Sequence, residues 1–211
     1  MKRGVLYHQE MYASLGNSML EHFPNGGIRM ADFGCGDLSS TAKLLSSQAF
    51  NGKINTLIGV DGAPDLLKTA QTNVQGLACT KNFLCGDMLG MCRKMKTGSL
   101  DVIFTSYALH HLQTFEKKDF VLECKRVLRP GGIFVMVDAV RTPGQSRDEW
   151  ISTLEAEFRA NQREGLEGVL EHMHTSDFPD TIETICAFVK DWQSVKVTVD
   201  KGYCACIVFV K

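Results

Sequence analysis

Two acidic residues and a glycine-rich turn are the residues best placed to do chemistry. Residues 30–37 read as an apolar strand that ends in Asp32, followed by a turn that contains Gly34 and Gly36. Glycine has no Cβ, so this turn lets a ligand approach the bare backbone. A second acid, Asp61, ends the next apolar run, where a carboxylate can accept hydrogen bonds from ribose hydroxyls. Together these positions predict a cofactor that contains adenosine.

The same turn lacks the features that bind phosphate. A dinucleotide fingerprint needs a third glycine where this chain has Ser39, and no Gly-Lys-Ser/Thr phosphate loop occurs in the sequence. No lysine or arginine lies between Asp32 and Ser40, whereas Asp32 and Asp37 place two carboxylates beside the turn. Such a turn suits a cation. S-adenosylmethionine fits, because it is a phosphate-free adenosine with a sulfonium and an amino group. The alternative is a tight strand-to-helix turn that binds nothing.

The composition predicts one domain with a substantial core, because 44% of the 211 residues are apolar. The net charge is −1, from 23 basic and 24 acidic residues, which argues against a nucleic-acid partner. The sequence shows no signal peptide and no apolar stretch of membrane-spanning length. None of the eight cysteines forms a Cys-x-x-Cys pair, so we expect a reducing, cytoplasmic environment and no metal site.

Strands and helices alternate along the chain. Strands are expected at 28–33, 56–60, 82–85, 100–105 and 133–137, and helices at 5–20, 39–48, 64–74, 88–96, 116–128 and 180–191. Residues 129–132 (Arg-Pro-Gly-Gly) are expected to form a turn. Runs 195–199 and 204–210 form a hairpin, with Gly202 in its turn. This pattern predicts an α/β, Rossmann-like, doubly wound sheet of seven strands, in which five are parallel and a C-terminal antiparallel hairpin follows.

Within this single domain, 1–211, four parts are expected. Residues 1–22 form an N-terminal lid helix, 28–140 the cofactor-binding core, 145–178 a substrate-lid insertion, and 180–211 the last helix and hairpin. The insertion is polar, helical in part and without strands. Its Trp150 and Phe158 are interpreted as packing residues of the lid.

Five motifs in this order resemble those of class I S-adenosylmethionine-dependent methyltransferases, in the style of the ubiquinone-biosynthesis-like branch that mainly modifies small molecules. They are Asp32-Phe33-Gly34-Cys35-Gly36, Gly59-Val60-Asp61, Cys85-Gly86-Asp87-Met88, Leu109-His110-His111-Leu112 and Val127-Leu128-Arg129-Pro130-Gly131-Gly132. The chain departs from the family pattern at Leu38, where many relatives have a further glycine. The resemblance covers residues 28–140 closely and 180–211 more loosely.

The resemblance implies a set of cofactor-binding residues. They are Asp32, Gly34, Cys35, Gly36, Asp61, Gly62, Ala63, Asp87, Met88 and Ser106. Asp32 would hold the ammonium of the methionine moiety, Asp61 would bind both ribose hydroxyls, and Asp87 would accept from the adenine amino group. Asp61 and Asp87 as simple helix caps remain the alternative interpretation.

The acceptor side is predicted less sharply. Tyr107 and His110 follow the fourth strand and are the candidate catalytic residues, since a hydroxyl acceptor would need a base; His111 is interpreted as structural. The candidate substrate-lining residues are Tyr7, His8, Met11, Tyr12, His172 and His174. His172 and His174 are two positions apart and do not share a helix face, so they are expected to lie in a loop and not to bind a metal.

The favoured hypothesis is methyl transfer from S-adenosylmethionine to a small molecule, with S-adenosylhomocysteine as product, no metal, and no nucleic-acid or membrane partner. A homodimer is compatible with the sequence. The alternative is a non-catalytic S-adenosylmethionine-binding or protein-interaction module on the same fold. A nicotinamide oxidoreductase is disfavoured, because Ser39 replaces the third glycine of the fingerprint. The identity of the acceptor stays open.

Overall fold

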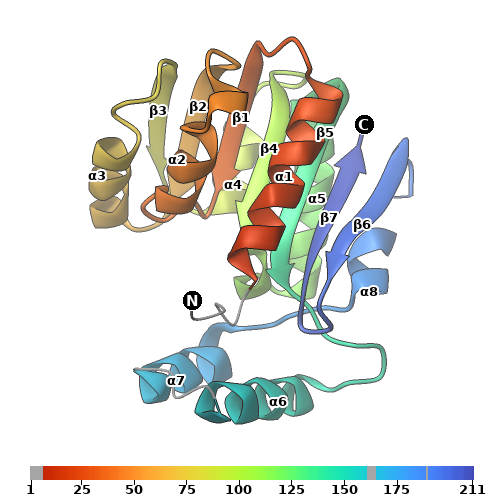
Figure 1. Ribbon diagram of the computed structural model, residues 1–211. Helices are drawn as coiled ribbons and strands as arrows, with labels where there is room; N and C mark the ends of the chain where they lie inside the picture. Colours follow the sequence, from red (N-terminus) through yellow and green to blue (C-terminus); the bar gives the residue numbers. More distant parts are fainter. Residues whose placement is uncertain (1–6, 161–164, 189) are drawn as a thin grey trace.

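The computed structural model describes residues 7–160, 165–188 and 190–211 (Figure 1). Its centre is a seven-stranded sheet with the order β3-β2-β1-β4-β5-β7-β6. The strands are β1 Ile28–Phe33, β2 Ile54–Asp61, β3 Thr80–Cys85, β4 Leu100–Ser106, β5 Leu128–Ala139, β6 Ser194–Asp200 and β7 Cys204–Val210. Strands β1 to β5 pair in parallel, and β7 pairs antiparallel with both β5 and β6. The predicted fold class is thereby confirmed.

Helices cover both faces of the sheet (Figure 1). The α-helices are α1 His8–His22, α2 Ser39–Leu45, α3 Pro64–Asn73, α4 Met88–Lys94, α5 Thr114–Val127, α6 Arg147–Ala160, α7 Leu166–Ser176 and α8 Ile182–Ala187, and the 3-10 helices are η1 Gln48–Phe50 and η2 Leu109–His111. Buried residues of α1, α2 and α3 belong to the core on one face, and those of α4, α5 and α8 to the core on the other. The sheet is therefore doubly wound, as the sequence predicted.

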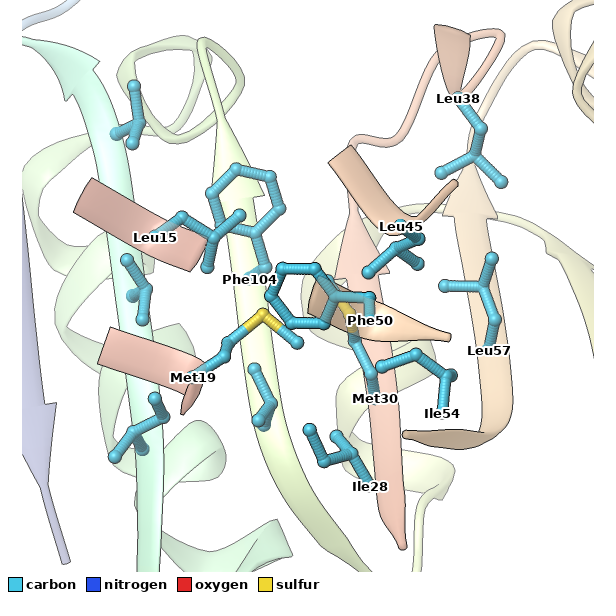
Figure 2. Packing of buried hydrophobic residues seen from close by; sticks show 14 of the residues in the cluster. Leu15, Met19, Ile28, Met30, Leu38, Leu45, Phe50, Ile54, Leu57 and Phe104 are labelled. Atoms are coloured by element: carbon cyan, nitrogen blue, oxygen red, sulfur yellow. The ribbon is translucent and has the colours of Figure 1, made fainter. Parts of the chain in front are cut away.

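Strand β1 shows how the sequence fills both cores. Met30 belongs to one core, whereas its neighbour Ala31 and also Phe33 belong to the other, because successive side chains of a strand point to opposite faces. Figure 2 shows Leu15 and Met19 of α1 beside Phe104 of β4 in the first core. Both α1 side chains are fully buried. This packing fixes α1 on the sheet, and it therefore also fixes the position of the α1 side chains that do not face the core.

The insertion after β5 is a pair of helices, α6 and α7, that lies beyond the end of the sheet (Figure 1). It has its own buried cluster of Trp150, Ile151, Leu154, Phe158, Leu170 and Met173. Trp150 and Phe158 were expected to pack the lid helix on the core; they are packing residues, but of the separate cluster that α6 and α7 share. The expected loop at His172–His174 is wrong, since both residues lie in α7.

Two further boundaries differ from the sequence prediction. Residues 129–132 are part of β5 and not a separate turn, because Gly131 N–H donates to the Lys211 carbonyl at 2.7 Å and Lys211 N–H donates to the Gly132 carbonyl at 3.0 Å. The end of the chain thus extends the ladder over the Pro-Gly-Gly segment. The helix expected at 180–191 is the short α8, which ends at Ala187.

None of the helices in the described part of the chain has the length and apolar character needed to cross a bilayer.

Candidate functional site

The glycine-rich turn after β1 contacts the segment that follows β4. Gly34 has φ +67°, and a Cβ on it would lie 2.2 Å from the Cβ of Ala108. Gly36 has φ +53°, but a Cβ there would meet nothing within 4 Å. Both conformations favour glycine. Gly34 is needed for packing, whereas Gly36 lies where a ligand has room to approach the backbone.

Asp61 connects the end of β2 to this turn. One carboxylate oxygen accepts from Gly36 N–H at 2.7 Å, and the other accepts from Ala63 N–H at 2.9 Å. Helix α3 begins at Pro64 with Ala63 as its N-cap residue, so Asp61 does not occupy the N-cap position. The carboxylate instead fixes the distance between two loops at the carboxyl edge of the sheet, where open α/β sheets bind ligands.

Asp32 is a buried carboxylate with one oxygen unsatisfied. The Thr41 hydroxyl donates to Oδ2 at 2.6 Å, whereas Oδ1 has no hydrogen-bond partner among the described residues. Burial raises the pKa of Asp32 to about 7, the Thr41 hydrogen bond lowers it, and the charge of Asp61 raises it. A cation placed at Oδ1 would favour the ionised form, so the geometry suits a positively charged ligand group.

Tyr12 brings α1 into the same site. Burial and the charge of Asp32 raise its pKa to about 12, against hydrogen bonds to Ser106, Thr41 and Ser40 that lower it. Tyr12 was expected on the acceptor side, and the structure places it next to the turn that follows β1. The roles of Ser40 and Thr41 were not predicted, although both open the helix directly after that turn.

Asp87 and Met88 lie at the end of β3. Asp87 is the N-cap of α4, and its Oδ1 accepts from Gly90 N–H at 2.6 Å. The side chain is exposed. The cap interpretation describes what Asp87 does in this structure, and a contact with adenine would use the exposed part of the same carboxylate.

Tyr107 and the start of α1 form the wall after β4. Tyr107 has φ +49°, and its ring centroid lies 4.8 Å from that of His8. Burial raises the pKa of Tyr107, and Cys204 raises it further, so the phenol is neutral at physiological pH. The Tyr7 ring lies 6.1 Å from that of Tyr203. Met11 is fully buried in the core, so its side chain packs under this wall and does not line it.

His110 is held by an acid that the sequence interpretation missed. Its Nδ1 contacts Asp138 Oδ1, while Asp138 Oδ2 accepts from the backbone N–H of Leu109 at 2.6 Å and of His110 at 3.2 Å. Asp138 and His110 are both buried. Asp138 is the acid near the end of β5, and its position after an apolar strand was the signal, just as it was for Asp32 and Asp61.

The insertion folds back onto this histidine. Phe178 N–H donates to the His110 carbonyl at 2.7 Å, and this places Asp177 next to η2. Asp177 Oδ1 lies 3.5 Å from His110 Nε2, 3.2 Å from His111 Nδ1 and 3.4 Å from His172 Nε2. His172 thus belongs to this group, whereas the contact given for His174 is made by its backbone, whose carbonyl accepts from Arg147.

A separate hollow of about 400 Å³ lies at the other end of the sheet, where the parallel strands begin. It is lined by residues at the start of β2 and before β3, among them Phe50, Ile54 and Cys79. Parallel strands present ligand sites at their carboxyl ends, and this hollow lies at their amino ends. It is therefore not part of the site described above.

Known proteins match both the sequence and the fold. A family model described as a methyltransferase domain matches residues 31–136, half of the chain. An uncharacterized methyltransferase from Synechocystis is 33% identical over 121 residues, which are 54% of this chain and 49% of the relative. The mouse N-terminal Xaa-Pro-Lys N-methyltransferase 1 is 31% identical over 137 residues, 61% of this chain and 59% of the relative. The chain thus spans about half the length of the Synechocystis relative.

The crystal structure of magnesium protoporphyrin IX methyltransferase from Synechocystis, with bound SAH (S-adenosylhomocysteine), has a TM-score of 0.65 to this chain at 14% identity. The match covers 97% of this chain and 83% of that one, and it shows a shared fold. Together with the family model, it confirms the family that the sequence motifs indicated. The chain belongs to the methyltransferase domain family and has the fold of the class I S-adenosylmethionine-dependent methyltransferases.

Proposed function

We propose that this chain transfers the methyl group of S-adenosylmethionine to a small-molecule acceptor, in the manner of the ubiquinone-biosynthesis-like branch. The observation that supports this most directly is the buried, half-satisfied carboxylate of Asp32 beside a turn with no basic residue. A phosphate would be repelled there, whereas the ammonium of the methionine moiety would satisfy the free oxygen.

The remaining cofactor contacts would come from other residues at the carboxyl ends of the parallel strands. Gly36 offers open backbone to the methionine moiety. Asp61 already accepts two backbone N–H groups, so ribose hydroxyls would share the remaining lone pairs of an oriented carboxylate. Met88 and the exposed side of Asp87 would meet the adenine. The substrate would enter between α1 and the α6–α7 pair, past Tyr107 and His8.

The chemical step needs few groups from the protein. A lone pair of the acceptor attacks the methyl carbon, the carbon–sulfur bond breaks, and its electron pair stays on sulfur to give S-adenosylhomocysteine. Alignment of the two reactants can supply about 7–11 kcal/mol of the barrier reduction. Tyr107 stays protonated. Its side chain is hydrogen-bonded to Cys204, so its ring would line the acceptor site beside His8. For a hydroxyl acceptor, His110 Nε2 is the candidate base, because its Nδ1 is held by Asp138.

Calorimetry with S-adenosylhomocysteine tests the cofactor site. We expect wild-type protein to bind it, Asp61→Ala to bind at least tenfold more weakly, a loss of about 1.4 kcal/mol, and Asp65→Ala to bind normally. Asp65 is an exposed acid in the first turn of α3, so it controls for the loss of one charge. Equal binding of NAD(H), or an unchanged affinity of Asp61→Ala, would contradict the assignment.

Turnover is tested by transfer of an isotopically labelled methyl group into pools of metabolites and, separately, into peptides. Label in a small molecule supports the proposal. Label confined to peptides would assign a protein acceptor. Tight cofactor binding without label in either pool would favour the non-catalytic module.

A further inference from the structure

Three histidine nitrogens converge on one carboxylate oxygen between η2 and α7. Asp177 Oδ1 lies 3.2–3.5 Å from nitrogens of His110, His111 and His172. Asp177 is only 5% exposed. No hydrogen bond of good geometry reaches this oxygen from the described residues, although His111 Nδ1, at 3.2 Å, is close enough to share a proton with it. A buried anionic oxygen without a hydrogen bond is costly, so the arrangement points to a cation that the protein groups share.

The state of His110 sharpens this argument. Its Nδ1 contacts Asp138, whose other oxygen accepts from two backbone N–H groups. The proton of a neutral ring therefore lies on Nδ1, and Nε2 presents its lone pair toward Asp177 Oδ1 at 3.5 Å. Two lone pairs that face each other need a positive charge between them. A histidine whose second nitrogen is held by a carboxylate is the usual arrangement of a metal ligand.

The spacing of the donor atoms also fits a metal. Ligands that lie about 2.0–2.2 Å from a tetrahedral zinc ion are about 3.4 Å apart. The three contacts of Asp177 Oδ1 have this length. One donor atom each of His110, His111 and Asp177 lie within 4.8 Å of one another. The side chains that carry these donor atoms would need to move little to coordinate one ion.

We propose that His110, His111 and Asp177 bind a divalent transition metal of the zinc class, with His172 as the adjacent fourth donor. Imidazole and carboxylate ligands suit zinc and its borderline neighbours. His111 Nδ1 also lies 3.2 Å from the Ser176 carbonyl, so metal binding requires this nitrogen to release a proton that it shares with that carbonyl. The proposal does not depend on methyl transfer, and with the ion bound His110 Nε2 would be a ligand and would not serve as the base proposed above.

The surrounding contacts preorganise the site. Arg147 of α6 donates to the carbonyls of Asp177 at 2.6 Å, Met173 at 2.8 Å and His174 at 2.6 Å. Buried Lys117 of α5 donates to Asp180 at 2.7 Å. The segment that carries Asp177 is thus held from two sides. A metal at this point would connect the lid to the core, because η2 and α7 each contribute ligands.

Cobalt(II) titration of the full chain, without an affinity tag and after treatment with a chelator, tests the proposal. We expect one ion per chain, visible ligand-field bands of a four-coordinate nitrogen and oxygen site, displacement by zinc, and a higher melting temperature with either ion. His111→Ala and Asp177→Asn should each weaken binding at least tenfold. His174→Ala removes a histidine of the same helix outside the cluster and should bind as wild type does.

Two results would overturn the proposal. The first is a thiolate–cobalt charge-transfer band, which would place the ion on some of the eight free cysteines. The second is wild-type binding no tighter than that of the two ligand variants, in which case no ion binds at this position. If either variant fails to fold by circular dichroism, the wild-type spectrum and stoichiometry alone decide between these outcomes.

Discussion

Replacement of Asp32 by asparagine should stabilise the ligand-free protein at neutral pH and weaken cofactor binding. Asparagine keeps an oxygen that can accept from the Thr41 hydroxyl, which now bonds Oδ2 at 2.6 Å. It removes the charge that burial disfavours and the unsatisfied anionic oxygen. The change therefore separates the cost of the buried acid from its proposed use.

The magnitude follows from the pKa of about 7 in the folded state against 3.8 as the ordinary value. Because the folded state holds this proton more tightly, the free energy of unfolding is highest below pH 4 and falls as the pH rises toward 7. The whole window corresponds to about 4 kcal/mol at about 1.4 kcal/mol per pH unit. Between pH 5 and pH 7, the part due to Asp32 is about 2 kcal/mol, and between pH 5 and pH 8 it is about 3 kcal/mol.

Urea unfolding of wild type and Asp32→Asn at pH 5 and pH 8 measures this difference. The advantage of the variant in unfolding free energy should grow by about 3 kcal/mol from the lower to the higher pH. Other titrating groups cancel in the comparison. Asp37→Asn is the matched control, since Asp37 lies on the same turn and accepts from Ser39 N–H at the partly exposed surface; its pH profile should parallel wild type.

The second part of the test measures how the cofactor affinity of wild type and Asp32→Asn depends on pH. An ammonium at Asp32 Oδ1 lowers the pKa of the carboxyl, so binding releases a proton below pH 7 and the affinity of wild type should rise with pH through this range. Asp32→Asn should bind more weakly and without this pH dependence. Parallel stability profiles of the two proteins, or equal affinities at pH 8, would refute the reasoning.

Substitutions at four positions near the carboxyl ends of the strands can be compared by urea unfolding. Gly34→Ala should cost about 2–4 kcal/mol, because the new Cβ would lie 2.2 Å from that of Ala108 and φ is +67°; Gly36→Ala, with open space around it, should cost less. Asp87→Ala should cost about 1 kcal/mol through the lost cap to Gly90, and Asp87→Asn should restore most of it. Leu38→Gly should relieve a left-handed backbone yet destabilise by about 2 kcal/mol, because a buried side chain is lost.

The sheet could be predicted from sequence because its strands are continuous apolar runs. β4 is buried over almost its whole length, and each βα unit begins and ends with local signals such as Gly34 or Pro64. Residues 129–132 were misjudged because their strand character depends on pairing with Lys211, at the far end of the sequence. The backbone hydrogen bonds to Lys211 outweigh the local preference of these residues for a turn, and such long-range pairing cannot be read from the local sequence.

The candidate site could likewise be predicted where local sequence marks its residues, but not where it depends on contacts between distant elements. Asp32 and Asp61 lie at the carboxyl ends of β1 and β2, so the apolar runs that precede them in the sequence revealed them. The His110–Asp138 pair joins the 3-10 helix η2 to strand β5, and Asp177 reaches η2 only because the α6–α7 pair folds back. His172 was predicted to line the substrate site, and a metal-binding role was rejected because of its spacing to His174. Its contact with Asp177, beyond the end of α7, could not be predicted from that spacing. Spacing arguments describe one helix, whereas these contacts arise between elements.

Unfavourable local features collect at the carboxyl edge of the sheet. All three non-glycine residues with positive φ in the described part of the chain, Tyr7, Leu38 and Tyr107, flank it. Among the described residues, the buried carboxylate oxygens without a hydrogen bond belong to Asp32 and Asp177, and they lie at the same edge. Each such feature costs about 1–3 kcal/mol.

A fold tolerates these features together only where the rest of the structure compensates. Here two apolar cores, one on each face of the sheet, supply that compensation. The two orphaned oxygens are of the same kind, anionic and buried, yet they belong to different parts of the site: one faces the glycine turn and the other faces three histidines. On the two proposals above, each would be satisfied by a different cation, an organic ammonium at Asp32 and a metal ion at Asp177. Stabilisation by S-adenosylhomocysteine should therefore persist in Asp177→Asn, and stabilisation by zinc should persist in Asp32→Asn, whereas a single shared cation site would make each variant lose both.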